Sequence, residues 1–427
     1  MQLRLPLDRA RMARWRTYSV FAFGVLTSSL GDRMALVAIA AVFYQRTGHG
    51  LAVGVSLALL FAPTLVFSMV GGYLADRYSR PLLIILSHLG GAAAVLGLAL
   101  GPPLPVMLVL VPALGTCTAI SVPAIRALIA DLVPEDEALT RGNAIYNFGY
   151  NAFFFAGPYV SGILFALWGA STVFVLDALT FLVSAGALTI IRPAATMRRP
   201  PPAASAAAAV PAGSSPGARL AAALSGVTIM WGHRKTRGIA ISIVAVVVAG
   251  GTMSGALIGV AERVFGAGTV GFGTLAAGTG LGLMLASLYL LFRPPRDMDR
   301  WLARGIALMA IGYAIVAGAP VLWIAAGGLV VSGAGNALQN LANSVVIQRT
   351  LPRTEHGRAF GALFMFGSMA QVPGLIVGGT LLDVVPVRLE SLGCAVLMAC
   401  AVAVAWVLVA SPLAAAPAPA AGDGGGR

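Results

Sequence analysis

The chain has 427 residues, of which 58% are apolar and 10% are charged, and its mean hydropathy is +0.89. Soluble domains carry about 25% charged residues, so the composition excludes a soluble globular protein. The formal net charge of +13 would favour nucleic acid as the partner of a soluble chain, but here the basic residues lie mainly in short segments between apolar runs. Membrane proteins fix their orientation in this way, so we expect a lipid bilayer around the chain and no nucleic-acid partner.

Twelve apolar runs, each long enough to cross a bilayer as a helix, follow one another along the chain. Their bounds are 17–44, 51–75, 82–100, 105–128, 143–167, 171–191, 239–263, 269–292, 302–319, 321–347, 360–383 and 387–410. We therefore predict an all-α membrane protein with twelve transmembrane helices. The first run is too long for a signal peptide and carries two charges, so we expect it to be retained.

The runs fall into two six-helix pseudo-repeats. Residues 193–218 have a Pro, Ala, Ser and Gly composition that cannot bury a core, and they separate six runs from six. Pro134 and Pro352 occupy equivalent loops of the two halves, 218 residues apart. The predicted units are an N-terminal bundle over 1–192, a cytoplasmic linker with a candidate interfacial helix over 193–238, a C-terminal bundle over 239–411 and a disordered tail over 412–427.

The distribution of Lys and Arg predicts the orientation. With the N-terminus inside, 24 of the 28 basic residues fall in inner segments and 3 in outer segments, while Arg33 lies within the membrane. Cytoplasmic loops carry such an excess of positive charge. We expect a multi-pass protein of the cell (inner) membrane with both termini in the cytoplasm.

The segment GGYLADRYSRP at 71–81 covers the end of the second run and the loop before the third. It resembles the Gly-x-Leu-Ala-Asp-Arg-x-Gly-Arg-Arg signature of the major facilitator superfamily, with Ser79 in place of the late Gly and Pro81 in place of a basic residue. The whole layout is similar to that family. The segment GDRMALVAIAAVFYQRTGHGLAVG and the Pro loops after the fourth and tenth runs resemble its branch of macrolide-efflux proteins and the enterobactin exporter. The resemblance implies two halves that rock about a central site.

The resemblance also implies a cytoplasmic gate around this signature. Gly72 is expected to let the second helix approach a neighbour closely, and Asp76 to cap the positive N-terminus of another helix. Asp131, at the inner end of the fourth run, is the candidate partner of Arg77 and Arg80. The alternative is that these are ordinary loop charges that only set the topology.

The fifth run contains AGPYVSGIL, which resembles the Gly-Pro-x-x-Gly-Gly signature associated with antiporters, with Ser161 in place of the first late Gly. Gly157 and Pro158 are expected to bend the helix, and Ser161 and Gly162 to allow close packing. Small residues are common in membrane helices, so plain packing is the alternative interpretation.

Asp32 and Arg33 lie near the middle of the first run, where a charge costs at least about 2.5–3.5 kcal/mol. That cost implies a cavity, a partner or neutralisation, so Asp32, with Arg33 beside it, is the first candidate for carrying a coupling proton. The alternative is a static ion pair. Glu262, near the outer end of the seventh run, is the second candidate, unless it simply lies among outer headgroups. Asp177 in the sixth run is interpreted as a packed structural carboxyl.

Polar stripes predict where a substrate cavity lies. The tenth run carries four amides at spacing i, i+3, i+4, i+7, which places them on one helical face. In lipid that face would be costly, so it is expected to line a cavity or to bond to a neighbouring helix. The cavity candidates are Ser28, Asn147, Asn151, Asn336, Gln339, Asn340 and Asn343.

No pattern favours an enzyme. Lys235, the one lysine, has no phosphate-binding loop around it, and the four histidines lack the spacing of a metal site or a nucleophile motif. We expect no cofactor and no metal. The hypothesis is a monomeric secondary transporter that exports amphipathic small molecules in exchange for protons. The alternatives are a facilitator or importer of a small nutrient, and a transport-dead membrane scaffold or sensor.

Overall fold

The computed structural model describes residues 5–133, 136–191, 225–293 and 297–411, and these residues form helices without any β-strand. The helices of the N-terminal half are α1 (Leu5–Thr47), α2 (Gly50–Phe61), α3 (Pro63–Arg77), α4 (Arg80–Ala99), α5 (Leu104–Leu132) and α6 (Asp136–Thr189). Those of the C-terminal half are α9 (Arg234–Gly259), η2 (Val260–Val264), α10 (Gly268–Phe292), α11 (Met298–Gly318), α12 (Leu322–Thr350), α13 (His356–Val384), α14 (Val387–Ala405) and η3 (Trp406–Ala410).

The prediction of twelve transmembrane helices in an all-α fold is confirmed. Among the described residues, ten helices are long and apolar enough to cross a membrane. One of them, α6, contains two spans, because Gly169 adopts φ 78° and breaks the helix in a conformation that glycine reaches without strain. The remaining span is α12, whose four amide side chains make it less apolar than its neighbours.

The two segments of α6 pack against α1 in opposite directions. Their contacts pair Tyr18 with Gly142, Leu26 with Gly149 and Arg33 with Gly157 along the first segment, and Gly31 with Asp177 and Gly24 with Ser184 along the second. In the first set the residue numbers of α1 and α6 increase together, so the two segments are parallel. In the second set the numbers of α6 decrease as those of α1 increase, so the two segments are antiparallel. Gly169 therefore reverses the chain at the far end of this bundle, as the separate fifth and sixth runs predict.

The boundaries differ from the predicted ones in a few places. The second predicted span, 51–75, is divided into α2 and α3 beside Pro63, whose missing N–H favours a helix start. The seventh and twelfth spans end as short π-helices, η2 and η3. The predicted linker over 193–218 and the tail over 412–427 lie outside the described residues, and a helix over 225–232 occupies part of the stretch in which an interfacial helix was predicted.

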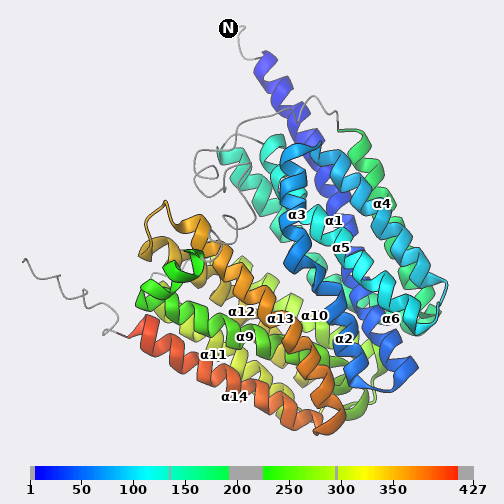
Figure 1. Ribbon diagram of the computed structural model, residues 1–427, viewed down its shortest axis with the longest axis vertical. Coiled ribbons are helices and arrows are strands. Elements are labelled where there is room, and N and C mark those ends of the chain that lie inside the picture. The colour runs from blue at the N-terminus through cyan, green and yellow to red at the C-terminus, as the bar shows by residue number, and fades with distance from the viewer. Residues whose placement is uncertain (1–4, 134–135, 192–224, 294–296, 412–427) are drawn as a thin grey trace, which may run out of the picture.

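The helices form two bundles, α1–α6 and α9–α14, which meet mainly through two helix pairs: α2 with α13 and α6 with α10. We call the end at which α1 begins, α6 ends and α9 begins the linker end, and the opposite end the far end. In Figure 1 the ribbons of the two bundles converge toward the far end, at the lower right, and diverge toward the linker end.

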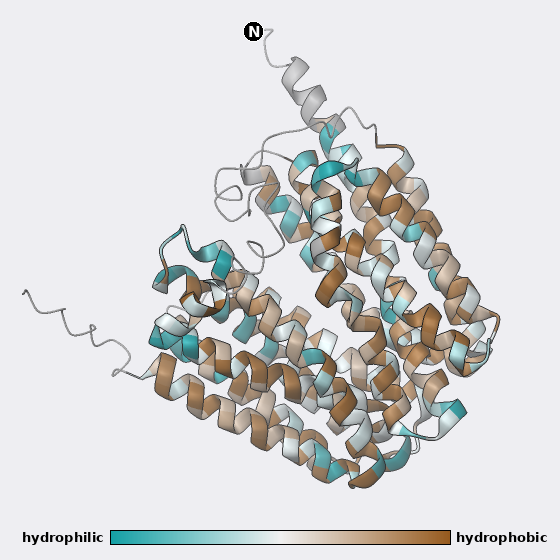
Figure 2. Ribbon diagram, viewed as in Figure 1, coloured by the Kyte–Doolittle hydropathy of each residue, from teal (hydrophilic) through white to brown (hydrophobic). Residues whose placement is uncertain are grey.

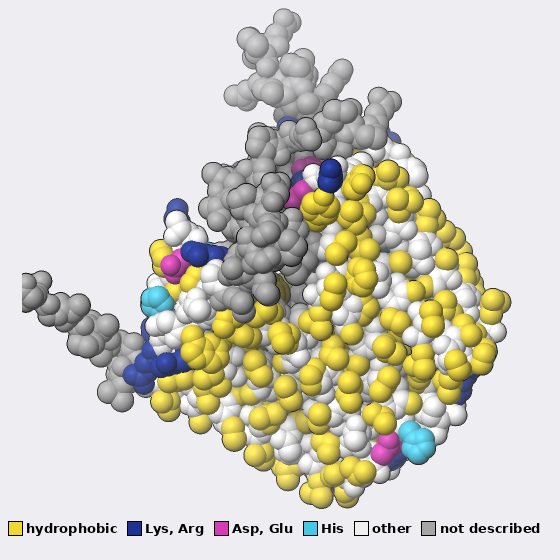
Figure 3. All heavy atoms as spheres, in the orientation of Figure 1, with side chains coloured by type: hydrophobic (Ala, Val, Ile, Leu, Met, Phe, Trp, Pro, Cys, Tyr) yellow, Lys and Arg dark blue, Asp and Glu magenta, His cyan; other side chains and the backbone are white. Residues whose placement is uncertain are grey.

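Glycines permit the close approach at the interface. A Cβ on Gly162 would lie 2.6 Å from the carbonyl oxygen of Thr269, and a Cβ on Gly54 would overlap the carbonyl oxygen of Leu375. Small residues let membrane helices pack backbone to backbone in this way. Figure 2 colours most residues of both bundles as hydrophobic, and Figure 3 shows hydrophobic side chains across the visible face with charged side chains gathered at its margins. The chain is a multi-pass membrane protein.

Candidate functional site

Asp32 lies near the middle of α1, and its neighbour Arg33 turns away from it. The Arg33 guanidinium donates a hydrogen bond to the Tyr150 hydroxyl and lies 4.4 Å from the ring centroid of Phe154, both on α6. Among the described residues, Asp32 forms no ion pair and accepts no hydrogen bond, and the residue as a whole has intermediate exposure. The structure therefore shows no direct Asp32–Arg33 ion pair, and the Tyr150 and Phe154 side chains of α6 hold the guanidinium.

Two other ionisable groups of the sequence analysis lie apart from Asp32. Asp177, on the second segment of α6, is fully buried against Gly31. Glu262 lies in η2 at the far end and is half-buried, and within the described part of the chain it forms no ion pair with Arg263. Ser28, a cavity candidate one turn before Asp32, is buried and donates to the Val25 carbonyl oxygen at 2.9 Å.

The residues expected to form the cytoplasmic gate lie together at the linker end. Arg80 Nη1 is 2.5 Å from Asp131 Oδ1, and the same nitrogen donates to the Ala127 carbonyl at 3.2 Å. This pair links the start of α4 to the end of α5 inside one bundle. Arg77 instead donates to the Tyr73 hydroxyl. Asp76 is exposed and, among the residues that the structure describes, has no hydrogen-bond or ion-pair partner.

In α3 the close helix contact predicted for Gly72 is made by its neighbour Gly71. Gly72 was expected to make the close helix contact, but a Cβ at Gly72 would meet nothing within 4 Å. A Cβ at Gly71 would lie 2.7 Å from the carbonyl oxygen of Ile120 on α5. The sequence identifies two adjacent candidates, and only the rotation of α3 about its axis decides which of them faces α5.

The span-five motif lies between the two bundles. Gly157 packs on Arg33 of α1, and the Ser161 hydroxyl donates to the Met34 carbonyl at 2.8 Å. Gly162 faces α10 of the other bundle, where the Thr269 hydroxyl lies 3.4 Å from the Gly162 carbonyl oxygen. The motif thus allows α6 to contact both α1 and α10 closely, as its small residues predict.

The amide stripes divide into different environments. On α12, Asn336 and Asn340 bond to each other at 2.5 Å on the more exposed side, whereas Gln339 and Asn343 are buried. The four amides therefore lie on one helical face but differ in burial: Gln339 and Asn343 lie on its buried side, and Asn336 and Asn340 on its more exposed side. The buried amides include three atoms without hydrogen-bond partners, Gln339 Nε2 and both polar atoms of Asn343.

The stripe on the first segment of α6 is partly bonded. Asn147 is exposed and accepts a hydrogen bond from Arg126 Nη1 at 3.2 Å, and the Arg126 guanidinium lies 5.0 Å from the ring centroid of Tyr146. Asn151 is half-buried. These residues lie on the linker-end half of the segment, on the side of the bundle where Arg33 meets Tyr150.

A contact at the far end joins the two bundles and was not predicted. Asp383, near the end of α13, accepts hydrogen bonds from the backbone N–H groups of Gly50 and Leu51 at 2.7 and 3.0 Å. It thereby caps the N-terminus of α2, whose own N-cap residue, His49, makes no capping bond. Carboxylates are stabilised at this end of a helix by the unsatisfied N–H groups and the helix dipole.

Arg263 braces the same carboxylate. Its Nη2 lies 3.4 Å from Asp383 Oδ1, and its remaining nitrogens donate to the Leu382 carbonyl and, at 3.0 Å, to the Tyr44 hydroxyl of α1. We call Asp383, Arg263 and the first turn of α2 the far-end contact. The only sequence signal for it is an α2 start without a capping side chain, and no local pattern shows that the cap comes from residue 383.

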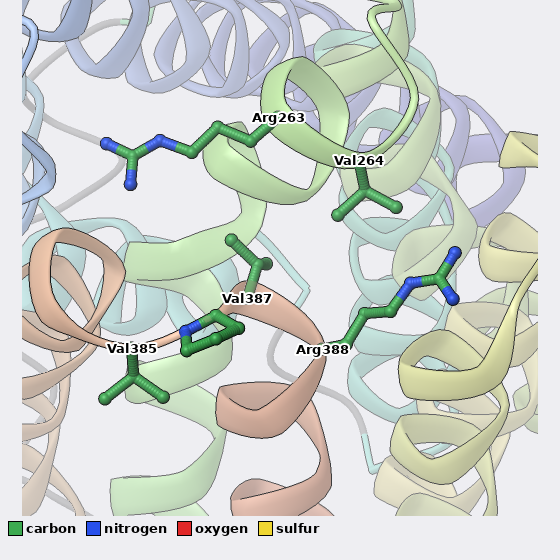
Figure 4. Close-up of a pocket in the computed structure, with 6 residues that line it drawn as sticks. Arg263, Val264, Val385, Val387 and Arg388 are labelled. Atoms are coloured by element: carbon green, nitrogen blue, oxygen red, sulfur yellow. The ribbon is translucent and has the colours of Figure 1, made fainter.

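A pocket of about 430 Å³ lies next to this contact, between η2 and the start of α14. Figure 4 shows its three valines between two arginines, Arg263 and Arg388, whose guanidinium groups point in opposite directions. Arg388 donates to the Ala319 carbonyl at 3.2 Å. Since neither guanidinium points into the space, the pocket is mainly apolar, and it lies at the far end rather than beside Asp32.

Two six-helix bundles that meet along two helix pairs, with a charged residue in the middle of the first span, define a membrane transporter rather than an enzyme. The family model described as the Major Facilitator Superfamily matches residues 21–296, and the chain belongs to this family. The resemblance found in the LADR segment is confirmed. Members of the family act on small-molecule substrates.

Relatives of the chain include proteins with export names. The chain is 26% identical over 87% of its length to the uncharacterized MFS-type transporter YfiS of Bacillus subtilis, of which 88% is covered. It is 27% identical to macrolide efflux protein A of Streptococcus pyogenes over 37% of this chain and 40% of that one. It is 32% identical to the multi-drug resistance efflux pump PmrA of Streptococcus pneumoniae over 32% of this chain and 34% of that pump.

Solved structures share the fold. A bacterial homologue of the human lysosomal transporter Spinster, solved in an inward-facing and unoccupied conformation, has a TM-score of 0.70 at 15% identity, with 95% of this chain and 99% of that chain covered. A single-residue mutant of the nucleoside transporter NupG has a TM-score of 0.70 at 12% identity, with 92% and 99% covered. At such identities the likeness establishes the fold alone.

Proposed function

We propose that this protein is a secondary active exporter that moves amphipathic small molecules out of the cell by alternating access, in exchange for protons. The names of two relatives support export: a macrolide efflux protein and a multi-drug efflux pump. Both bundles then act as rigid units that rock about the paired helices of the interface.

The observation that carries proton coupling is the state of Asp32. The residue has intermediate exposure near the middle of a transmembrane helix, and its only charged neighbour in sequence is held by Tyr150. An ionised carboxylate is disfavoured in a dry environment and favoured in a wet one. A cavity that alternates between these conditions would let Asp32 take up a proton on one side and release it on the other.

We further propose that the linker end faces the cytoplasm. In this orientation 24 of the 28 basic residues lie on the inner side and 3 on the outer. In a variant without the native Cys117, Cys394 and Cys400, single cysteines placed at Ser205 and Ala421 should resist an impermeant thiol reagent in intact cells. Labelling of either position before lysis would reverse the assignment.

The function is tested by accumulation of a panel of dyes, macrolides and siderophores in cells with and without the protein. Export predicts lower accumulation that an uncoupler reverses. Uncoupler-sensitive higher accumulation would indicate import instead, and no effect across the panel would favour a scaffold or sensor.

Asp32→Asn sharpens the test, because it mimics the protonated carboxyl and keeps its shape. It should abolish uphill export and leave substrate exchange down a gradient in place. If the variant still builds a pH-dependent gradient, Asp32 is not the proton carrier and Glu262 is the next residue to replace. Thr27→Ala, which removes a hydroxyl that donates to the Phe23 carbonyl of the same helix, serves as a control for general disturbance of this part of α1.

A further inference from the structure

Two arginines lie within membrane-spanning helices of the N-terminal bundle and have no acidic partner there. They are Arg33 on α1 and Arg126 on α5, and none of the ion pairs formed by the described residues includes either of them. A guanidinium at membrane depth is costly unless a partner or water stabilises its charge. We call Arg33 and Arg126 the arginine pair.

Two stacked tyrosines of α6 lie between the members of the arginine pair. The ring centroids of Tyr146 and Tyr150 are 6.2 Å apart, with an interplanar angle of 20°. The Arg126 guanidinium lies 5.0 Å from the centroid of Tyr146 at one end of this stack, and Arg33 donates to the Tyr150 hydroxyl at the other end. Cation–π contacts orient a guanidinium but supply no formal negative charge.

Both guanidinium groups keep donors that the described residues do not use. A guanidinium has five N–H donors in a planar fork. Within the described part of the chain, Arg126 donates to Asn147 Oδ1 at 3.2 Å and Arg33 donates to the Tyr150 hydroxyl. The fork geometry matches the two oxygens of a carboxylate or the oxygens of a phosphate, so the unused donors fit an oxygen anion.

Arg33 points away from the buried side of α1. On that side Gly31 admits Asp177 of the second segment of α6. Arg33 follows Gly31 by two residues, and two steps of about 100° place it on the opposite side of the helix. There its Cβ packs on Gly157 of the first segment of α6.

The first segment of α6 also borders the other bundle. A Cβ on Gly280 of α10 would lie 2.6 Å from the carbonyl oxygen of Phe154, so the two helices touch at this level. Tyr150 and Tyr146 lie between this level and the linker end, toward which the two bundles diverge in Figure 1. Arg126, over Tyr146, is exposed. The arginine pair therefore begins where the bundles separate, and it is accessible from the linker end.

The charges around the arginine pair leave an excess of positive charge. Asp32 adjoins Arg33 in the chain and can offset one of the two arginines, whereas Asp177 lies on the opposite side of α1. Two arginines and an ionised Asp32 carry one net positive charge, and protonation of Asp32 adds another. In both cases an anion bound to the arginine pair lowers the cost of holding these charges at membrane depth.

We propose that the arginine pair binds the anionic group of the transported compound, so that the substrates are amphipathic organic anions whose apolar part lies against the aromatic side chains of α6. Carboxylate, sulfonate and phosphate groups all present oxygens that a guanidinium binds. The proposal rests on the proposed export and names its substrate class.

Two dyes with the same xanthene ring system and opposite charge test the substrate class. Fluorescein is an organic anion at neutral pH and enters cells as its uncharged diacetate, and rhodamine 6G is a cation. Cells with the protein should retain less fluorescein than cells without it, with a smaller difference for rhodamine 6G. Export of only cationic or neutral compounds of the panel would overturn the anionic class and leave export in place. Export of no compound at all would refute the proposed function itself.

Arg126→Gln tests the site, because this exposed side chain can be shortened without opening the core. In inside-out membrane vesicles the half-saturating concentration of fluorescein should rise about tenfold, within the range for loss of a hydrogen bond to a charged group. Uptake of rhodamine 6G should stay the same or increase, because a positive charge has been removed. Arg126→Lys keeps the charge without the planar fork and should have a smaller effect.

Arg141→Gln is the matched control. Arg141 lies on the same segment of α6 nearer to the linker end, with its guanidinium 5.7 Å from the ring centroid of Trp15, and it is outside the arginine pair. Its replacement should alter the transport of neither dye. An equal loss of both dyes in Arg126→Gln would make Arg126 a structural residue, and fluorescein transport at the wild-type level would exclude it from binding. Either result overturns the proposal.

Discussion

The far end and the linker end of the bundle interface use the same chemical groups in different ways. At the far end, the Asp383 carboxylate caps α2 of the other bundle and Arg263 braces it. At the linker end, Arg80 pairs with Asp131 of its own bundle, and Asp76 has no partner among the described residues. A carboxylate near a helix end can thus join two bundles, as Asp383 does, or make no contact, as Asp76 does. In this state the two bundles are joined by such a contact at the far end.

This difference indicates what has to change during alternating access. The far-end contact must break, and a contact must form at the linker end, if the protein is to open the other way. A helix cap is worth about 0.5–2 kcal/mol, which is of the same order as the few kcal/mol that separate two functional conformations. Small contacts of this kind are therefore sufficient to set the balance between the states.

Among the substitutions at the bundle interface, Gly54→Val is expected to reduce transport the most, because it overpacks the far end. The new side chain would overlap the Leu375 carbonyl and press on the Cα of Gly379, 3.2 Å from an added Cβ. Overpacking of this kind costs about 1–3 kcal/mol, so the far end should be forced apart and transport lost. Pulsed EPR between spin labels at Leu100 and Trp323, exposed by 87% and 69%, should show a longer distance.

The matched control is Gly393→Val, because a Cβ at Gly393 on α14 would meet nothing within 4 Å. It adds the same volume on a surface that faces neither bundle interface, and it should leave transport and the EPR distance unchanged. Unchanged distances in Gly54→Val would mean that the far end is not tightly packed in the membrane.

A smaller loss of transport is expected from Asp76→Asn at the linker end. Since Asp76 makes no contact in the described state, the substitution should leave this state intact while weakening the contact expected at a helix N-terminus in the other state. We expect transport to fall by about tenfold, for a loss of about 1.4 kcal/mol. Spin labels at Leu82 and Phe364 should report a smaller fraction of the state with a closed linker end.

Insertion into the membrane serves as the control for Asp76→Asn, and it should match that of the wild type. Turnover at the wild-type rate would reduce the LADR segment to a topology signal, which is the alternative interpretation of its charges.

The smallest effect is expected from Asp383→Asn, which removes the charge but keeps one oxygen that can accept from α2. Loss of the charged cap and of the Arg263 pair should cost about 1 kcal/mol, because both groups are partly exposed to solvent. The Leu100–Trp323 label pair should then show about a fivefold rise in the far-end-open fraction. Arg388→Gln, which removes the nearby arginine outside the contact, should leave the fraction unaltered.

The sequence by itself determined the number and order of the spans, the two halves and the family, because hydropathy and short motifs are local properties of the chain. It also identified Asp131 as a candidate partner of Arg80, since the start of α4 and the end of α5 lie at the same end of two consecutive antiparallel helices. The chain reversal at Gly169 likewise follows from the break between two apolar runs.

Only the tertiary structure decided which faces of the helices meet. Gly71 rather than Gly72 contacts α5, and Gly31 admits Asp177, because the rotation of each helix about its axis depends on all of its neighbours. The same holds for Asp383, whose partners Gly50 and Leu51 lie more than 330 residues earlier in the chain. Their backbone N–H groups are common to every helix start, so no residue pattern marks them, and the cap exists only because α2 and α13 are packed side by side.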